Sequence, residues 1–142
     1  ANVLGISPRD VAPSYLAARG TPKTVSELAE HECVLFRGKN GRARWALECK
    51  GQKGGVDVHG SVSADDFAFV LAATIAGGGI ALLPRFIADP DVRAGKLIRV
   101  LAQHAARSTG GLYAVHASSK HVPRKVSAFR DFLIETLRAS PL

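Results

Sequence analysis

The sequence predicts an α/β domain with a mixed sheet flanked by helices. The first observation is the segment Ser63–Pro84, where an apolar helix, three consecutive glycines and a short apolar strand follow one another. Such a strand is typical of the buried centre of a parallel sheet, because both of its faces must be covered. The second observation is the alternation of apolar and polar residues over Arg44–Cys49 and again over Val56–His59, which is typical of half-exposed antiparallel strands. Together they indicate an α/β core rather than a surface module.

Length and composition agree with one globular domain. The chain has 142 residues, of which 46% are hydrophobic and 22% are charged, and no apolar run is long enough to cross a bilayer. We expect a cytoplasmic protein, since no signal peptide is recognisable and the two cysteines are too few for a disulfide framework. The chain contains no methionine. We therefore expect it to be a fragment whose natural N-terminus has been removed.

The first quarter of the chain predicts an extended start and two short helices. Asn2–Ser7 is extended, and Val11–Arg19 has helical spacing before a terminating glycine. Thr24 and Glu27 have the spacing of a capping box, so a helix of about two turns is expected to end near His31.

The next segment predicts a three-stranded antiparallel meander. Its strands are Cys33–Phe36, Arg44–Cys49 and Val56–His59, with turns at the Asn40-Gly41 dipeptide and at Gly51–Gly55. The two cysteines are interpreted as reduced core residues, and a redox-sensing pair is the alternative.

The long apolar helix is expected to start at Ser63 as N-cap. Asp65 and Asp66 then fall in its first turn, where negative charge complements the helix dipole. Because this helix has almost no polar face, it should be covered on more than one side. The run Gly77–Gly79 follows a helix and precedes a strand, which is the reverse of a phosphate-binding loop, so it predicts a tight turn with positive φ angles.

The remaining segments predict short elements and one long terminal helix. Val126, Phe129, Leu133 and Leu137 form an apolar stripe on that helix, and the stripe needs a partner. The expected elements are single helical turns at Pro84–Ala88 and Asp91–Ala94, strands at Leu97–Leu101 and Leu112–His116, a loop at Gln103–Gly110, and the helix Pro123–Arg138.

Nothing in the sequence indicates catalysis. The five histidines have no metal-ligand spacing, and no nucleophile motif is present. The Asp65-Asp66 pair is explained by its place at a helix start. We therefore expect no enzyme activity, no metal site and no cofactor.

The net charge of +7 is concentrated in one region, because six of the basic residues and a single acid lie between Arg37 and Lys53. One interpretation is a solvated hairpin with basic turns. The other is a positive rim that attracts an anionic small molecule or the phosphates of a nucleic acid.

Several segments of the chain resemble, in order, those of one known family. The stretch IAGGGIALLP at Ile75–Pro84 resembles a characteristic segment of the effector-binding domain of LysR-type transcriptional regulators. The resemblance covers nearly the whole chain, since it extends to APSYLAARGTPKTVSELAEHECVLF (Ala12–Phe36), Trp45 after a basic turn, DVRAGKLIRVL (Asp91–Leu101) and LYAVHASSKHVPRKVSAFRDFL (Leu112–Leu133).

The resemblance implies a fold similar to type 2 periplasmic binding proteins, with two lobes around an effector cleft. Residues 1–116 would be the second lobe, and residues 117–142 the return crossover and a helix of the first lobe. The winged helix that binds DNA and the rest of the first lobe would be absent. We expect a homodimer or higher homo-oligomer, formed through the Val126/Phe129/Leu133 face, and no membrane partner.

The resemblance also implies where a small effector would bind. The expected contacts are Ser7, Arg37, Gly38, Ala64, Asp65, Asp66, Phe67, Tyr113 and His116. A carboxylate effector suits the helix N-terminus; Asp65 and Asp66 oppose an anion there, and Arg37 compensates as a bidentate partner. The alternatives are a solute-binding protein of a transporter and a basic nucleic-acid-binding module.

Overall fold

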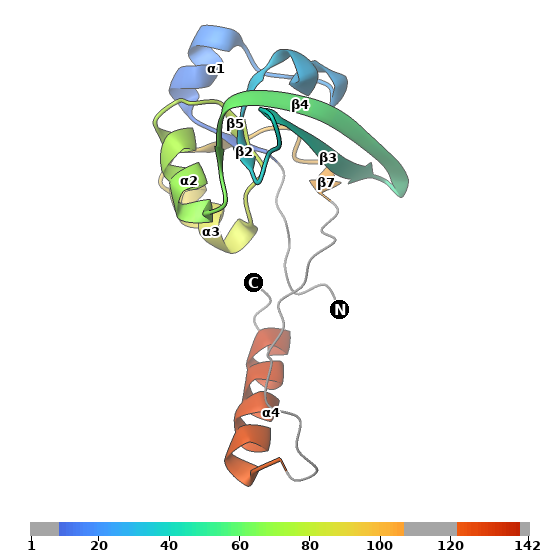
Figure 1. The fold of residues 1–142 in the computed structure, drawn as a ribbon, viewed down its shortest axis with the longest axis vertical. Helices are drawn as coiled ribbons and strands as arrows, with labels where there is room; N and C mark the ends of the chain where they lie inside the picture. The colour runs from blue at the N-terminus through green and yellow to red at the C-terminus, as the bar shows by residue number, and fades with distance from the viewer. Residues whose placement is uncertain (1–8, 107–121, 140–142) are drawn as a thin grey trace.

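The computed structural model describes residues 9–106 and 122–139. Its strands form one seven-stranded mixed sheet in the order β6-β1-β5-β2-β4-β3-β7. The strands are β1 (Asp10–Val11), β2 (Glu32–Phe36), β3 (Arg42–Cys49), β4 (Gln52–Ala64), β5 (Ile80–Ala81), β6 (Ile98–Arg99) and β7 (Ala105–Ala106). The helices are α1 (Pro13–Arg19), the 3-10 helix η1 (Ser26–Glu30), α2 (Phe67–Ile75), α3 (Arg85–Arg93) and α4 (Arg124–Ala139). The predicted α/β class is confirmed (Figure 1).

The apolar strand after the three glycines lies inside the sheet, as predicted. β5 pairs in parallel with β2 and antiparallel with β1. Both Ile80 and Ala81 are fully buried, because helices cover both faces of the sheet at this point.

The predicted antiparallel meander is wrong in its strand order. β2 pairs in parallel with β4, and only β3 and β4 form an antiparallel hairpin. The turn at Asn40 and Gly41, with φ angles of 52° and 68°, leads from β2 into β3. These two strands are not neighbours in the sheet, because β4, which comes later in the chain, lies between them. β4 then extends over 13 residues and pairs with a neighbour on each edge.

The second turn of this region is also shorter than predicted. It consists of Lys50 and Gly51, with φ angles of 49° and 79°, and β4 resumes at Gln52. Gly54 and Gly55 therefore lie in a strand rather than in the predicted Gly51–Gly55 turn. Two consecutive residues with positive φ are typical of a type I′ hairpin.

Several predicted boundaries are corrected. Val11 belongs to β1, so α1 starts at Pro13, and the two expected turns after Pro84 are one helix, α3, with Pro90 inside it. β6 is shorter than predicted, and β7 lies in the predicted Gln103–Gly110 loop. The segments Asn2–Ser7 and Leu112–His116 fall outside the described residues.

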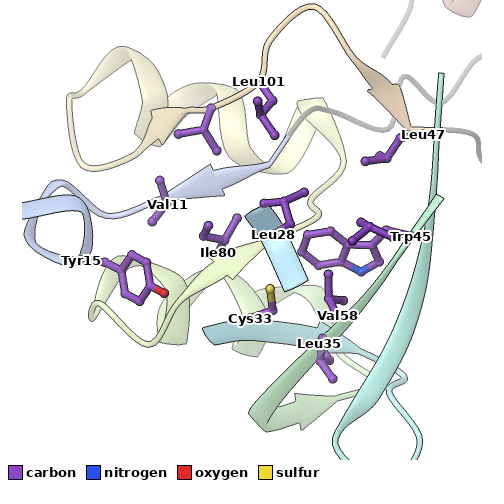
Figure 2. Close-up of a cluster of buried hydrophobic side chains, with 12 residues drawn as sticks. Val11, Tyr15, Leu28, Cys33, Leu35, Trp45, Leu47, Val58, Ile80 and Leu101 are labelled. Carbon is purple, nitrogen blue, oxygen red and sulfur yellow. The ribbon is translucent and has the colours of Figure 1, made fainter. Parts of the chain in front are cut away.

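Apolar side chains form one core on each side of the sheet. The larger cluster joins α1 and η1 to the β3–β4 hairpin, and Figure 2 shows Trp45 and Leu47 of the hairpin near Leu28 of η1. The smaller cluster packs α2 and α3 against β2 and β5 through residues such as Val70, Ala88 and Leu97. Burial of each large aliphatic side chain stabilises the fold by about 2 kcal/mol.

The glycine turn has the predicted geometry. Gly77 and Gly79 have φ angles of 87° and 145°, which favour glycine. A Cβ atom at Gly79 would collide with the carbonyl oxygen of Glu32, so the turn also requires glycine for the close approach to β2.

The strand register separates the two cysteines. Across the sheet, Glu32 of β2 pairs with His59 of β4, which in turn pairs with Arg42 of β3. Cys33 follows Glu32 and is buried, so it lies at the same level of the sheet as Arg42. Cys49 lies seven residues along β3 from Arg42, which is roughly 23 Å at about 3.3 Å per residue. A disulfide requires Cα atoms closer than about 7 Å. A disulfide between these two cysteines is therefore excluded in this fold.

Two helices have apolar surface that the rest of the described chain does not bury. α2 buries only Val70 and Thr74, while Phe69 on its other side is 55% exposed. The expected cover on more than one side of α2 is therefore not supplied by the described residues. α4 has no buried residue, and Phe129 and Phe132 are 61% and 60% exposed. None of the described helices is long and apolar enough to cross a membrane.

Candidate functional site

The carboxyl ends of β2 and β4 bring most of the predicted contact residues together. These parallel strands pair through Phe36 and Ala64, so Arg37 and Asp65 follow at the same edge of the sheet. In α/β sheets, ligands bind outside the carboxyl ends of parallel strands. The structure thus gathers Arg37, Gly38, Ala64, Asp65, Asp66 and Phe67 in one place, and their contact with an effector stays a prediction.

Arg37 lies in an unusual backbone conformation at this edge. Its φ angle is 53°, and its N–H donates to the carbonyl of Ala64 at 2.7 Å, which ties the loop to β4. Its exposed guanidinium lies over the Phe36 ring, with Cζ 5.0 Å from the ring centroid. Left-handed backbone is costly for a residue with a Cβ and is found where surrounding structure imposes it, often at functional sites.

The Phe36 ring beneath the Arg37 guanidinium is itself stacked on a second aromatic ring. The rings of Phe36 and Phe67 lie 3.9 Å apart between centroids at an interplanar angle of 11°. Both side chains are half-buried against the smaller core cluster. The stack connects the end of β2 to the first residue of α2, so it fixes the position of the helix relative to Arg37.

Gly38 has a packing role that the sequence did not indicate. Its N–H donates to Ser63 Oγ at 2.9 Å, so this amide already has a partner. A Cβ atom at this position would lie 2.7 Å from Leu35 Cδ1. Gly38 therefore closes the loop against Ser63 and Leu35.

The cap of α2 is one turn later than predicted. Asp66, not Ser63, is the N-cap residue, and its Oδ1 accepts from the N–H of Ala68 at 2.9 Å. Ser63 lies near the end of β4, because that strand continues to Ala64. Since a carboxylate of the chain itself already binds the helix N-terminus, an external anion has less to gain there. Among the described residues gathered at this edge, Arg37 is the cationic one.

Ser7, Tyr113 and His116 lie outside the described residues. Their predicted contacts with an effector therefore stay predictions.

The comparison with known families now decides the family. The model described as LysR substrate binding domain matches residues 11–138. The chain belongs to this family.

Named relatives agree with this assignment. The transcriptional regulator CrgA of Neisseria meningitidis serogroup C is 36% identical over 127 residues, which are 89% of this chain and 42% of CrgA. The probable regulator LtrA of Klebsiella pneumoniae is 32% identical over 89% of this chain and 41% of its own length. The chain thus spans less than half the length of these relatives.

Solved structures show the same fold. The regulatory domain of Neisseria meningitidis CrgA matches with a TM-score of 0.75 at 32% identity, covering 93% of this chain and 65% of that domain. The regulatory domain of AphB from Vibrio vulnificus matches with a TM-score of 0.69 at 22% identity, covering 92% of this chain and 64% of that one. This chain is therefore part of a LysR substrate binding domain, with a mixed sheet similar to periplasmic binding proteins.

A buried ionic cluster lies away from the strand-end site of this LysR domain. Arg9 and Asp10 are fully buried, and Asp10 accepts from Arg99 at 3.1 Å, while Arg99 also binds Asp89 at 2.7 Å. Burial raises the pKa of Asp10 to about 6 against the opposing effect of Arg99. Burial also lowers the pKa of Arg9 to about 10. No sequence pattern identified this cluster, because its partners are about 90 residues apart.

Arg9 joins the two ends of the described sheet domain. Its Nη2 donates to the carbonyls of Leu101 at 2.6 Å and His104 at 2.9 Å. Arg9 precedes β1, the first described strand, and Leu101 and His104 precede β7, the last one, so Arg9 links the beginning and the end of the described sheet. Among the described residues, no cluster of three or more His, Cys, Asp or Glu side chains could hold a metal ion.

Proposed function

We propose that this domain binds a small anionic effector at the carboxyl ends of β2 and β4 and passes the signal to a DNA-binding part of a longer regulator. The observation that carries the proposal is Arg37, an exposed guanidinium held over Phe36 at the edge where ligands bind in this kind of sheet. An arginine in this setting can form two parallel hydrogen bonds with a carboxylate. The Phe36–Phe67 stack supplies a rigid apolar wall beside it.

The rest of the effector site would come from outside the described sheet. In this proposal residues 1–116 are the second lobe, and residues 117–142 are the return crossover and a helix of the first lobe. Ser7, Tyr113 and His116 would line the cleft between the lobes. α4 has no buried side chain in the part of the chain that the structure describes, which supports this division, because its apolar face requires a cover.

Effector binding would act by changing the relative populations of two lobe arrangements. The changed angle would alter the geometry of a dimer whose winged helices bind DNA in the cytoplasm. The domain itself would bind and orient the effector without catalysis. The Asp65-Asp66 pair fits this view, because Asp66 has the capping role. All the relatives named above are regulators or probable regulators of transcription, which favours this function over transport or general nucleic-acid binding.

A thermal-shift screen with the intact regulator tests the proposal. Benzoate, cinnamate, succinate and citrate are suitable probes, since a ligand that binds only the folded state raises the melting temperature. An active carboxylate should lose its shift in the Arg37→Gln variant and keep it in Arg42→Gln, an exposed arginine in β3. Equal shifts in both variants would show that Arg37 is not the anion ligand.

A further inference from the structure

Within the described residues, the outer half of the β3–β4 hairpin has one edge without a strand partner. β2 meets β4 only from His59 onward, so Gln52–Val58 pairs with β3 alone in the described chain. Figure 1 shows this end of the hairpin extending beyond the other strands. Gln52–Gly55 and Asp57 are all exposed. Such an edge offers free backbone groups to another strand.

The hairpin turn determines which backbone groups face this edge. Cys49 and Gln52 flank a two-residue turn, and residues in that position exchange hydrogen bonds with each other. The pattern alternates along the ladder, so the N–H and C=O groups of Lys53, Gly55 and Asp57 point away from β3. Outside the sheet ladders, no backbone hydrogen bond within the described residues uses these groups.

The order of these three residues makes the edge self-complementary. We propose that two copies of this chain pair antiparallel through residues 53–57 of β4, with Gly55 opposite Gly55 of the second copy. This register places Lys53 opposite Asp57 of the other copy, and the two-fold axis repeats the pair. Opposite charges at directly paired positions stabilise a sheet, and identical patches on both copies close the assembly as a dimer.

The charges of the neighbouring strand extend the pattern. Within one chain Glu48 is paired in register with Lys53, and Arg44 binds Asp57 at 3.0 Å. The dimer would therefore join Glu48, Lys53, Asp57 and Arg44 in one row across four strands, with alternating signs. A shifted register that places Lys53 opposite Lys53 of the second copy would be destabilised by like-charge repulsion. The alternating charges therefore favour the register with Gly55 opposite Gly55.

The other face of the paired strands also fits. In the same register Val56 lies opposite Gly54 of the second copy. A Cβ atom at Gly54 would have only the Leu47 carbonyl near it, at 3.9 Å, so the space beside Gly54 is open. Val56 and Gly54 line a groove of about 600 Å³ between η1 and the hairpin. A second strand would cover part of this groove.

A charge-exchange experiment tests this pairing. Lys53→Asp and Asp57→Lys should each weaken self-association, because each places like charges opposite each other across the two-fold axis. An equimolar mixture of the two variants should form a heterodimer, since both charge pairs between the two copies then join opposite charges. The double variant should likewise regain association. Native mass spectrometry of differently labelled chains distinguishes these species.

Matched controls exclude unrelated effects. Lys125→Asp reverses an exposed charge on α4 and should leave association through the hairpin unchanged. Fluorescence of Trp45, which lies in β3, reports whether each variant keeps the hairpin folded. A mixture of the two folded single variants that forms no heterodimer would overturn the proposal. Saturable binding of an alternating Val-Asp peptide, without self-association, would also overturn it and assign the edge to an acidic peptide.

Discussion

At the scale of single residues, the domain keeps two costly features that sheet formation alone does not require. Arg37 has a left-handed backbone, which costs about 1 kcal/mol or more for a residue with a Cβ. Asp10 is fully buried as part of an ionic cluster. Both residues lie where the chain meets another part of a two-lobed protein in the proposed arrangement. Their cost is consistent with selection for binding and coupling rather than for stability.

Asp10 makes the stability of the domain depend on pH. The folded state holds the Asp10 proton up to a pKa of about 6, whereas the ordinary value is 3.8. The folded state therefore binds more protons in this interval, and the contribution of Asp10 to stability is lost as the pH rises from 4 to 6. The difference in unfolding free energy between wild type and Asp10→Asn should change by about 3 kcal/mol across this range.

Urea unfolding at several pH values measures this difference. Asp89, Arg9 and Arg99 surround the carboxyl group and remain in both proteins, so their effects largely cancel in the comparison. A difference that stays constant from pH 4 to pH 7 would contradict a raised pKa for Asp10.

At the scale of elements, the sequence predicted local structure better than strand neighbours. The apolar helix, the glycine turn and β5 follow from residue patterns over short distances. The parallel pairing of β2 with β4 does not, because alternation indicates a half-exposed strand without naming its partner. Likewise, the run Gly51–Gly55 predicts a turn, yet only Lys50 and Gly51 form it, because the ladder with β3 continues through the other glycines.

For the candidate site as well, the sequence predicted the location better than the contacts between residues. Its strand-end residues were expected from the family resemblance, and the structure gathers six of them in one place. Their individual roles required the three-dimensional structure, since Gly38 and Ser63 bind each other and Asp66 rather than Ser63 caps α2. The Arg9–Asp10–Arg99 cluster was missed because it depends on contacts between distant segments.

The close contact between β2 and the glycine turn should determine how much stability is lost when Gly79 is replaced. Gly79→Ala places a Cβ against the backbone oxygen of Glu32 and should destabilise the domain by more than about 3 kcal/mol. Gly20→Ala is the matched control, because Gly20 also has a positive φ, of 81°, but nothing lies within 4 Å of an added Cβ. Its cost should be about 1 kcal/mol from the backbone conformation alone. Equal losses in urea unfolding would show that the close contact with β2 is unimportant.

At the scale of the whole molecule, the described chain has two different surfaces that are suited to association. The β4 edge is polar, narrow and self-complementary in charge. The α4 face is apolar, and its exposed phenylalanines would lie against a first lobe in the intact regulator of the proposed function. Different physical forces act at the two surfaces, so salt should weaken contacts through the β4 edge and leave contacts through α4 largely unchanged.

The isolated chain should therefore associate through α4 when no first lobe covers it. Val126, Phe129 and Leu133 lie on one face of this helix, and exposed apolar surface of this kind drives association in water. Phe129→Glu combined with Leu133→Glu should lower the mass measured by light scattering at high salt, whereas Arg130→Glu on the same helix should not. Far-ultraviolet circular dichroism of the variants shows whether α4 remains helical. A mass that is unchanged by the double substitution would mean that α4 does not mediate association, and the exposed α2 face around Phe69 would be the next surface to test.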